Sequence, residues 1–380
     1  MKVLIINDRP HQFSLLKGVS DNLYLHGVDI DIIIPNAGIF YSPKGEKAPF
    51  FYRPYRHLCK YLYPKVILLR LFYRLYVYFV AKRYSAVDFQ GLFVKDYANI
   101  IKRLKSFCNQ RIKVTIWGSD FYRQAGGSYE EKELIYQLSD IIHISTQQMA
   151  DDFINSYPLY AGKIRIAHFG LERLKKMKEI ISSEKRKIPS FLLQKDERLV
   201  VTCGYNGSPA QQHGLIIEAL KKLPVEIKKK LFVVLPMTYG TSPDYCSVIK
   251  GLMGNSGLDY HIVDHYLSEE DLIQLRLRTN IAVNMQITDA FAGSIQEHIM
   301  AGNLLVVGDW LPYHRIFEDN NIFVRYTKKE NLDENLKWAI DNYALVQDKL
   351  QNNSDAIYKF SSWDNIVEKW ARIYYELHNN

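Results

Sequence analysis

Short apolar runs alternate with longer amphipathic stretches along this chain of 380 residues. Runs rich in Ile and Val are typical of strands buried on both faces of a parallel sheet, and apolar positions that recur every three or four residues predict helices. In the N-terminal half, strands are predicted at 2–6, 29–34, 86–89, 113–117, 141–145 and 163–167, and helices at 13–26, 96–110, 129–138 and 146–156. This alternation predicts one doubly wound α/β domain.

The alternation stops in a highly charged stretch at 173–197 and then restarts. Strands are predicted at 199–203, 231–235, 260–263, 281–284 and 304–307, and helices at 213–223, 244–254, 269–277, 294–301, 332–350 and 363–377. We therefore predict an α/β protein with two Rossmann-like, doubly wound domains facing a central cleft. The predicted parts are an N-terminal domain at 1–172, a linker at 173–197, a C-terminal domain at 198–355, and a helix within 356–380 that crosses back to the N-terminal domain.

The excess of basic residues is concentrated in one segment. The chain has 49 Lys and Arg against 41 Asp and Glu, but residues 53–84 contain eight of the basic residues and no acid, so the rest of the chain is neutral. A helix beginning near Pro64 would place Arg70 and Arg74 on one face and apolar and tyrosine side chains on another. This pattern indicates a helix on an anionic membrane surface, because its apolar run is too short and too charged to span a bilayer. A core helix of the first domain is the alternative interpretation, and a general nucleic-acid surface is not indicated.

Several classes of protein are disfavoured by what the sequence lacks. The four cysteines lie far apart without a CxxC pair, and the first ten residues have no apolar stretch long enough for a signal peptide, so we expect a cytoplasmic protein. Neither GxGxxG nor GxxxxGK[ST] occurs. The one DxD sequence, Asp29-Ile30-Asp31, lies in a predicted strand rather than in a loop, so we expect no metal site and no cofactor.

The stretch 288–309 carries the most informative pattern of polar residues. Asp289 lies in the loop after a predicted strand, Gly293 and Ser294 open a helix, and Glu297 follows one turn later. Small residues at a helix start let a phosphate approach free backbone N–H groups, and a carboxylate one turn further on can accept hydrogen bonds from ribose hydroxyls. The alternative is structural, because Ser294-x-x-Glu297 also matches a capping box and Asp289 also fits an ordinary loop acid.

The same stretch resembles the E-x7-E signature of GT-B glycosyltransferases, especially the family-4-like bacterial enzymes of surface-polysaccharide assembly. The resemblance extends to IWGSDFYR at 116–123, KIRIAHFGLE at 163–172, VTCGYNGSPAQQHGLIIEAL at 201–220 and VDHYLSEEDL at 263–272. LPMTYG at 235–240, followed by Tyr245, is similar to lipid-linked fucosamine transferases of enterobacterial antigen assembly. By position, the resemblance implies that Glu297 binds the ribose of a nucleotide-sugar donor, that Gly293 and Ser294 meet the diphosphate, and that Asp289 lies beside the sugar. Asp289 is one methylene shorter than the usual Glu.

The resemblance also implies donor contacts from other strand ends of the second domain. The turn formed by Gly204, Asn206 and Gly207 would face the phosphates or the sugar, and the backbone at Tyr239 and Tyr266 would contact the base. Family members place a Lys or Arg shortly after this turn to neutralise the diphosphate. Residues 204–214 contain neither, so His213 is the one candidate there, with a solvated helix-start residue as its alternative interpretation.

Residues of the first domain are expected to face the acceptor. Asp120 follows a buried strand, where it could contact the acceptor or activate its hydroxyl, or else serve as the N-cap of the next helix. Arg9 in the first loop and Arg123 are candidates for the missing cation, with Arg9 also a candidate catalytic residue. His11 and His143 are alternative polar groups at the same edge.

Together, the resemblance implies a glycosyltransferase that moves a sugar from a nucleotide-sugar donor to a lipid-linked glycan acceptor in surface-polysaccharide or lipopolysaccharide synthesis. We expect retention of the anomeric configuration, with inversion as the alternative that the fucosamine-transferase-like segment favours. We also expect no metal, no cofactor beyond the donor, no nucleic-acid partner, and a cytoplasmic enzyme held peripherally at the membrane by residues 53–84. Two alternatives remain: a nucleotide-sugar epimerase of the same fold, and a non-catalytic basic membrane-binding protein.

Overall fold

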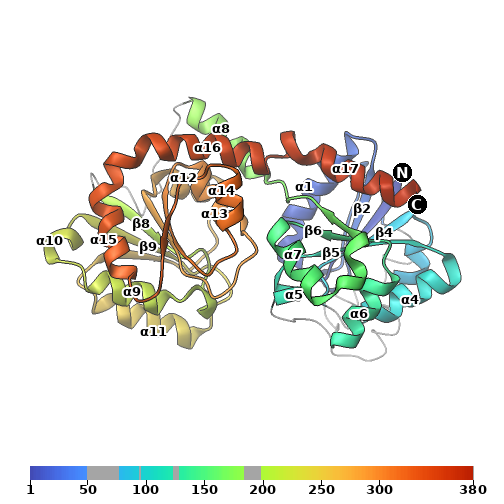
Figure 1. The fold of residues 1–380 in the computed structure, drawn as a ribbon, viewed down its shortest axis with the longest axis horizontal. Helices are drawn as coiled ribbons and strands as arrows, with labels where there is room; N and C mark the ends of the chain where they lie inside the picture. The colour runs from blue at the N-terminus through green and yellow to red at the C-terminus, as the bar shows by residue number, and fades with distance from the viewer. Residues whose placement is uncertain (49–76, 94–95, 123–127, 184–197, 380) are drawn as a thin grey trace. The chain divides into compact units, whose positions relative to one another are not determined.

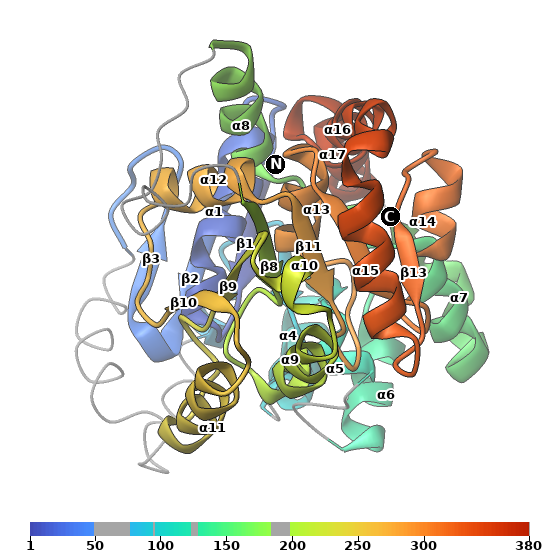
Figure 2. The ribbon, with the colours of Figure 1, turned by 90° about the vertical axis from the view of Figure 1, so that its left-hand side faces the viewer.

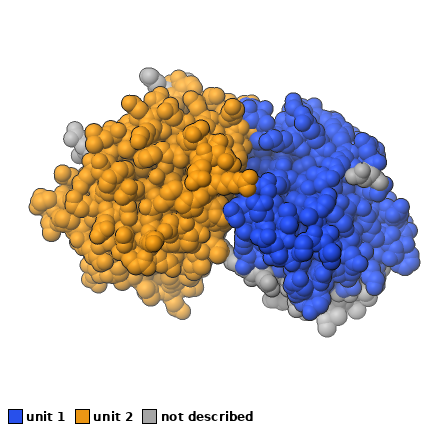
Figure 3. All heavy atoms as spheres, viewed as in Figure 1, with its two compact units in different colours: residues 1–171, 363–380 blue, residues 172–362 orange. Residues whose placement is uncertain are grey.

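The computed structural model describes residues 1–48, 77–93, 96–122, 128–183 and 198–379. These residues form two compact units, coloured separately in Figure 3. Unit 1 consists of Met1–Leu171 with Trp363–Asn380, and unit 2 consists of Glu172–Ser362. The chain therefore leaves unit 1 once and returns to it with its last helix.

Unit 1 is built on a seven-stranded sheet with the order β3-β2-β1-β4-β5-β6-β7. The strands are β1 (Lys2–Ile6), β2 (Asp29–Ile34), β3 (Ile39–Tyr41), β4 (Ala86–Gln90), β5 (Arg111–Ile116), β6 (Ile141–Ile144) and β7 (Ile164–Ile166). Every neighbouring pair is parallel except β2 with β3, which is antiparallel. The inner strands are buried along almost their whole length, as expected for a sheet covered on both faces.

Helices cover both faces of this sheet (Figure 1). They are α1 (Phe13–Tyr24), α4 (Tyr97–Cys108), α5 (Ser119–Tyr122), α6 (Tyr129–Leu138), α7 (Gln147–Ser156) and α17 (Trp363–Asn379), with short 3-10 turns at Pro10–Gln12, Pro35–Ala37 and Pro158–Lys163. α1 and α17 pack together, and Leu16 of α1 and Trp370 of α17 share one hydrophobic core with β1 and β2. The last helix therefore belongs to the same unit as the first strand.

Unit 2 contains a six-stranded, fully parallel sheet with the order β10-β9-β8-β11-β12-β13. Its strands are β8 (Leu199–Cys203), β9 (Leu231–Pro236), β10 (Asp259–Val263), β11 (Ile281–Asn284), β12 (Leu304–Gly308) and β13 (Arg325–Thr327). From β8 the chain first adds β9 and β10 on one side, and it then returns to add β11, β12 and β13 on the other side of β8. That reversal is the point where open α/β sheets bind ligands, outside the carboxyl ends of the strands.

The helices of unit 2 also form two layers, seen end-on in Figure 2 with α9 and α11 on one side of the sheet and α12 and α13 on the other. They are α8 (Glu172–Ser183), α9 (His213–Lys221), α10 (Val225–Lys228), α11 (Pro243–Gly254), α12 (Glu269–Arg278), α13 (Gly293–Met300), α14 (His314–Asp319), α15 (Leu332–Asn342) and α16 (Gln347–Ser361), with 3-10 turns at Pro209–Gln211 and Tyr343–Val346. α15 packs on α9, whereas α13 packs on α8, α12 and α16.

The strand–helix order agrees with the prediction, with differences at a few elements. The helix predicted at 332–350 is divided by the turn at Tyr343–Val346, and α16 continues to Ser361. The predicted linker begins in α8, which belongs to unit 2, while 184–197 lies outside the described residues. Most of the predicted membrane-binding segment also lies outside them, and no helix in the described ranges is long and apolar enough to cross a bilayer.

Candidate functional site

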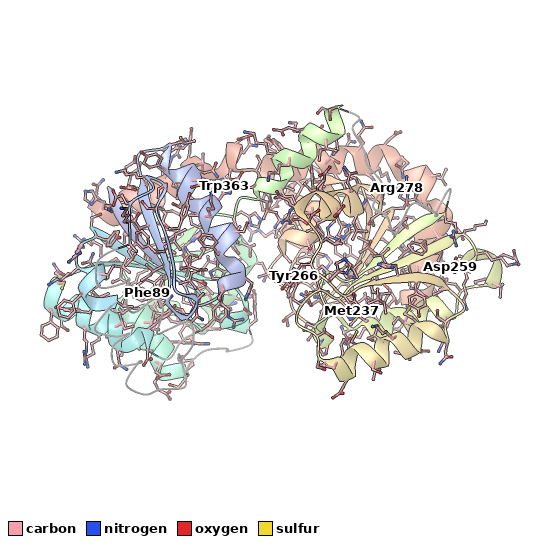
Figure 4. All side chains as sticks on the ribbon, turned by 180° about the vertical axis from the view of Figure 1, so that it is seen from behind. Phe89, Met237, Asp259, Tyr266, Arg278 and Trp363 are labelled. Carbon is pink, nitrogen blue, oxygen red and sulfur yellow. The ribbon has the colours of Figure 1, made fainter. Side chains whose placement is uncertain are left out.

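The carboxyl ends of the strands of unit 2 bring together most of the predicted site residues. Loops after β8, β9, β10 and β11 carry Gly204, Asn206, Gly207, Tyr239, Tyr266 and Asp289, and α13 begins at the same edge with Gly293 and Ser294. Figure 4 shows Met237 and Tyr266 at this edge and Asp259 at the opposite end of the sheet. The parallel sheet therefore brings residues that lie far apart in the sequence to one edge.

Glu297 lies in α13 with only 3% of its surface exposed, and two arginines bind it. Arg276 of α12 donates its Nε–H to Oε2 at 3.2 Å, and Arg173 of α8 donates to Oε1. Arg276 is itself 1% exposed, and burial lowers the pKa of its guanidinium while Glu297 opposes that shift. A buried carboxylate is thus neutralised by cations from two neighbouring helices.

The capping-box interpretation of Ser294 and Glu297 is wrong. The helix begins at Gly293 after Ala292, and no side chain caps it. The Ser294 hydroxyl accepts a hydrogen bond from Nη2 of Arg276 at 2.7 Å, while Glu297 faces the arginines rather than the backbone. The N–H groups of the first turn are therefore left without a side-chain acceptor from this pair, and the helix dipole adds positive potential there.

Asp289 organises the loop that leads into α13. Its Oδ1 accepts the N–H of Ala290 at 2.8 Å, its Oδ2 accepts the N–H of Ala292 at 3.2 Å, and the Tyr313 hydroxyl also donates to Oδ2. Phe291 within this loop has a φ of 65°, a conformation that non-glycine residues rarely adopt. These contacts give Asp289 a structural role in shaping the loop, and its contact with a donor sugar stays a prediction.

The turn after β8 brings backbone close to the same edge. Gly204 has a φ of 68°, and the Asn206 side chain accepts the N–H of Ser208 at 2.9 Å. A Cβ on Gly207 would lie 2.6 Å from the Cβ of Thr241, so only glycine fits against the loop after β9. The turn is held by its own polar contacts, as a preformed binding loop requires.

His213 opens α9 and is fully buried, so the solvated alternative is wrong. Its Nδ1 lies 3.1 Å from the Tyr245 hydroxyl, and burial lowers its pKa to about 4, which keeps the imidazole neutral near pH 7. Its Nε2 would lie 3.1 Å from a Cβ on Gly204. His213 therefore lies at the predicted turn but supplies no positive charge.

Tyr239 and Tyr266 project from adjacent strand ends. Their rings are parallel within 2° with centroids 6.3 Å apart, and they are 44% and 72% exposed. Burial raises the pKa of the Tyr239 phenol, a hydrogen bond with Asn206 lowers it, and the nearby charge of Arg276 also lowers it. The tyrosine pair thus presents open aromatic faces beside the arginine and carboxylate cluster.

In unit 1, Asp120 is 1% exposed and joins two loops at the carboxyl edge of the sheet. It accepts the N–H of Leu92 at 2.8 Å and that of Trp117 at 2.9 Å, and burial raises the pKa of its carboxyl. The N-cap alternative is wrong, because Asp120 is the second residue of α5 and not the residue that precedes the helix. Its action on an acceptor stays a prediction.

The other polar candidates of unit 1 differ in their surroundings. The guanidinium of Arg9 lies 3.9 Å from the centre of the Phe93 ring, and His11 is exposed in the first 3-10 turn. His143 is a core residue: its Nε2 is 2.8 Å from the Ala167 carbonyl oxygen, and burial holds its pKa well below the usual range. Arg123 lies outside the described residues.

The DxD sequence is part of a strand, as predicted. Asp29 pairs with Lys44 at 2.7 Å, and Asp31 accepts the Tyr84 hydroxyl at 2.7 Å. Within the described ranges, no cluster of three or more His, Cys, Asp or Glu side chains has the arrangement of a metal site.

Sequence reasoning missed Arg173 and Arg276. Arg276 stands in the sequence LRLR near the end of a helix that begins with three acids, so it was indistinguishable from a solvated helix residue. The apolar residues on either side, Leu275 and Leu277, are also buried, and this position inside a buried run is the one signal that could have identified it. Arg173 fell in the stretch interpreted as a linker.

Several solved structures share the fold of this chain at low sequence identity. HepE from Anabaena, in complex with UDP and glucose, superposes with a TM-score of 0.71 at 12% identity, covering 99% of this chain and 100% of that chain. Sucrose-phosphate synthase from Thermosynechococcus elongatus gives a TM-score of 0.71 at 13% identity, covering 100% and 99%. A glycosyltransferase from Rickettsia africae gives 0.69 at 14%, covering 100% and 99%.

The chain has the GT-B fold. This confirms the predicted fold class of two Rossmann-like units, whereas the predicted central cleft concerns their relative placement and stays a prediction. No family model matches the chain, and no curated protein matches it in sequence.

Proposed function

We propose that the chain is a glycosyltransferase that binds a nucleotide-sugar donor at the carboxyl edge of unit 2. The observation that carries the proposal is Glu297, a buried carboxylate one turn inside α13, beside an uncapped helix start and an open aromatic pair. The fold supports it, since HepE and the trehalose-6-phosphate synthase from E. coli were solved with UDP-glucose and UDP-2-fluoro glucose.

Each part of the edge suits one part of the donor. Glu297 accepts hydrogen bonds from the ribose hydroxyls, and the N–H groups of Gly293 and Ser294 hold the diphosphate at the positive end of the helix. Tyr239 and Tyr266 stack on the base. The sugar lies toward the turn at Gly204 and toward Asp289, and unit 1 presents Asp120 or Arg9 to the acceptor. Transfer proceeds with retention and without a metal.

The donor site is tested by nucleotide binding to the full chain. One of UDP, GDP, dTDP and ADP is expected to raise the melting temperature, since a ligand that binds only the native state stabilises it. Glu297→Gln keeps the shape but loses the charge, and we expect its affinity to fall by roughly tenfold or more. The matched control is Glu226→Gln, an exposed acid of α10 paired with Lys229. No shift with any nucleotide would contradict the proposal, as would unchanged affinity in Glu297→Gln.

We further propose a lipid-linked glycan acceptor and peripheral binding to the cytoplasmic membrane. The basic segment 53–84 supports this, and so do side chains in and beside its described end. Phe79 and, in α4, Phe107 are exposed and contact Tyr78, and the Lys82 ammonium lies 5.1 Å from the Phe79 ring. Basic residues next to exposed aromatics are typical of anionic membrane surfaces.

Vesicle sedimentation tests this surface. The parent is expected to sediment with phosphatidylglycerol vesicles and less with phosphatidylcholine vesicles, and Arg70→Glu with Arg74→Glu is expected to abolish the difference. The control is Leu159→Ser, which changes an exposed apolar side chain in the 3-10 turn Pro158–Lys163 of unit 1. Undiminished sedimentation of the double variant would overturn the membrane proposal without affecting the donor site.

A further inference from the structure

The diphosphate of a nucleotide donor carries negative charge that the turn after β8 does not neutralise. Residues 204–214 contain no Lys or Arg, and His213 is neutral. An inference about the missing cation rests on the proposed function, because it concerns the same donor. Two cations of unit 2 contact Glu297 in α13, and they differ in how firmly they are held.

Arg276 is fixed in place. Its three nitrogens each have a partner: Nε binds Glu297 at 3.2 Å, Nη1 lies 3.0 Å from Nε2 of His298, and Nη2 binds Ser294 at 2.7 Å. The side chain is 1% exposed. It therefore orients Glu297 and the first turn of α13, but moving it to a ligand would break three hydrogen bonds at once.

Arg173 is held much less firmly. It is the second residue of α8, 30% of its side chain is exposed, and its guanidinium contacts Oε1 of Glu297. Its Nε lies 3.8 Å from Glu269, beyond hydrogen-bond distance, and has no hydrogen-bond partner among the described residues. Glu269 is in turn shared with Lys176. Arg173 can leave Glu297 without stripping that carboxylate of its other partner, Arg276.

Arg173 and Arg276 share the single buried carboxylate of Glu297, so positive charge is in excess around it. In the proposed complex, ribose hydroxyls need the oxygen of Glu297 that Arg173 occupies. We propose that Arg173 is the cation that neutralises the donor diphosphate, and that it exchanges its contact with Glu297 for the phosphate when the ribose binds. Donor binding thus breaks the contact between Arg173 and Glu297 and forms two new ones, between Glu297 and the ribose and between Arg173 and the phosphate.

This exchange predicts opposite effects of Arg173 on two ligands. The nucleoside diphosphate that stabilises the parent, among UDP, GDP, dTDP and ADP, is compared by calorimetric titration with its own nucleoside. In Arg173→Gln the diphosphate is expected to bind at least about tenfold more weakly. The nucleoside, which has no phosphate and no longer competes with Arg173, is expected to bind equally well or more tightly. Arg173→Lys, which keeps the charge, should retain part of the preference for the diphosphate.

The control is Lys176→Gln, which removes a positive charge one turn along α8 without touching Glu297. It is expected to leave both affinities near those of the parent. Equal weakening of the two ligands in Arg173→Gln would reduce Arg173 to a support for Glu297 and overturn the inference, as would unchanged diphosphate binding. A parent that binds no nucleotide would instead overturn the donor site itself.

Discussion

Two buried polar atoms at the turn after β8 have no hydrogen-bond partner among the described residues. They are Nε2 of Gln211 and Nε2 of His213, both beside Gly204, where a Cβ would lie 3.0 Å from Oε1 of Gln211 and 3.1 Å from Nε2 of His213. Unpartnered buried polar atoms are costly and uncommon in folded proteins. Both groups are neutral, so they suit hydrogen bonds to a sugar or a water more than they suit charge neutralisation. The division of labour that we propose, with Arg173 carrying the charge, agrees with this.

The neutral state of His213 predicts a pH dependence of stability. Its folded pKa, about 4, lies below the ordinary value of 6.5, so the unfolded chain takes up its proton first as the pH falls. The contribution of neutral His213 to the free energy of unfolding is fully present above pH 6.5. It is lost between pH 6.5 and 4, where the free energy of unfolding falls by up to ~1.4 kcal/mol per pH unit. Buried His143 and His298 act in the same direction, because burial also lowers their pKa.

His213→Asn isolates the share of His213. Urea denaturation at several pH values between 7.5 and 4.5 is expected to show a shallower loss of stability in the variant, by up to ~1.4 kcal/mol per pH unit. At pH 7.5 the comparison gives the cost of the lost packing alone. An identical pH dependence in parent and variant would show that folding does not lower the pKa of His213.

At the scale of elements, the last helix is held to the sheet of unit 1 by a buried polar network. Lys113 of β5 donates to Asp88 of β4 at 2.7 Å and to Thr115 at 2.6 Å, and the Tyr374 hydroxyl of α17 donates to the same Asp88 oxygen at 2.6 Å. The Lys113 ammonium also lies 5.1 Å from the Trp370 ring centre. A buried ion pair is tolerated when such contacts complete it. The network therefore fixes where α17 lies along the sheet.

Tyr374→Phe tests this anchoring. Removal of the hydroxyl leaves the buried Asp88 one hydrogen bond short, and we expect unfolding of unit 1 to become easier by roughly 1–3 kcal/mol. The control is the neighbouring Tyr375→Phe, whose exposed hydroxyl donates to the His26 carbonyl oxygen and should matter by less than ~0.5 kcal/mol. Equal losses in the two variants, measured by chemical denaturation, would argue against the network.

The elements that the sequence predicted well are those with a strong periodic pattern. β2 and β8 were predicted to the residue, because apolar runs in a parallel sheet are nearly continuous. The edge strands β3 and β13, of three residues each, were missed, although the equally short edge strand β7 lies within a predicted strand. At the site, Glu297 was predicted from its place after small residues, whereas Arg173 stands in a charged stretch and Arg276 is marked in the sequence only by its apolar neighbours.

At the scale of the whole molecule, all proposed donor-binding residues belong to unit 2. This unit is continuous in sequence, from Glu172 to Ser362, and has its own hydrophobic core between the sheet and α9, α11 and α15. Unit 1, in contrast, needs both ends of the chain, because α17 fills its core beside β1. We therefore expect unit 2, but not residues 1–171 alone, to fold as a separate chain.

We expect a chain of residues 172–362 to fold and to bind the nucleotide with a dissociation constant within about threefold of the parent's, because the ligand's partners all lie inside it. Circular dichroism and the same calorimetric titration measure this. A second chain, 1–362, keeps both units but lacks α17. It is expected to keep nucleotide binding while unit 1 loses its cooperative unfolding transition. If 172–362 folds but binds no nucleotide that the parent binds, residues of unit 1 must contribute to the donor site, and its assignment to unit 2 alone is wrong.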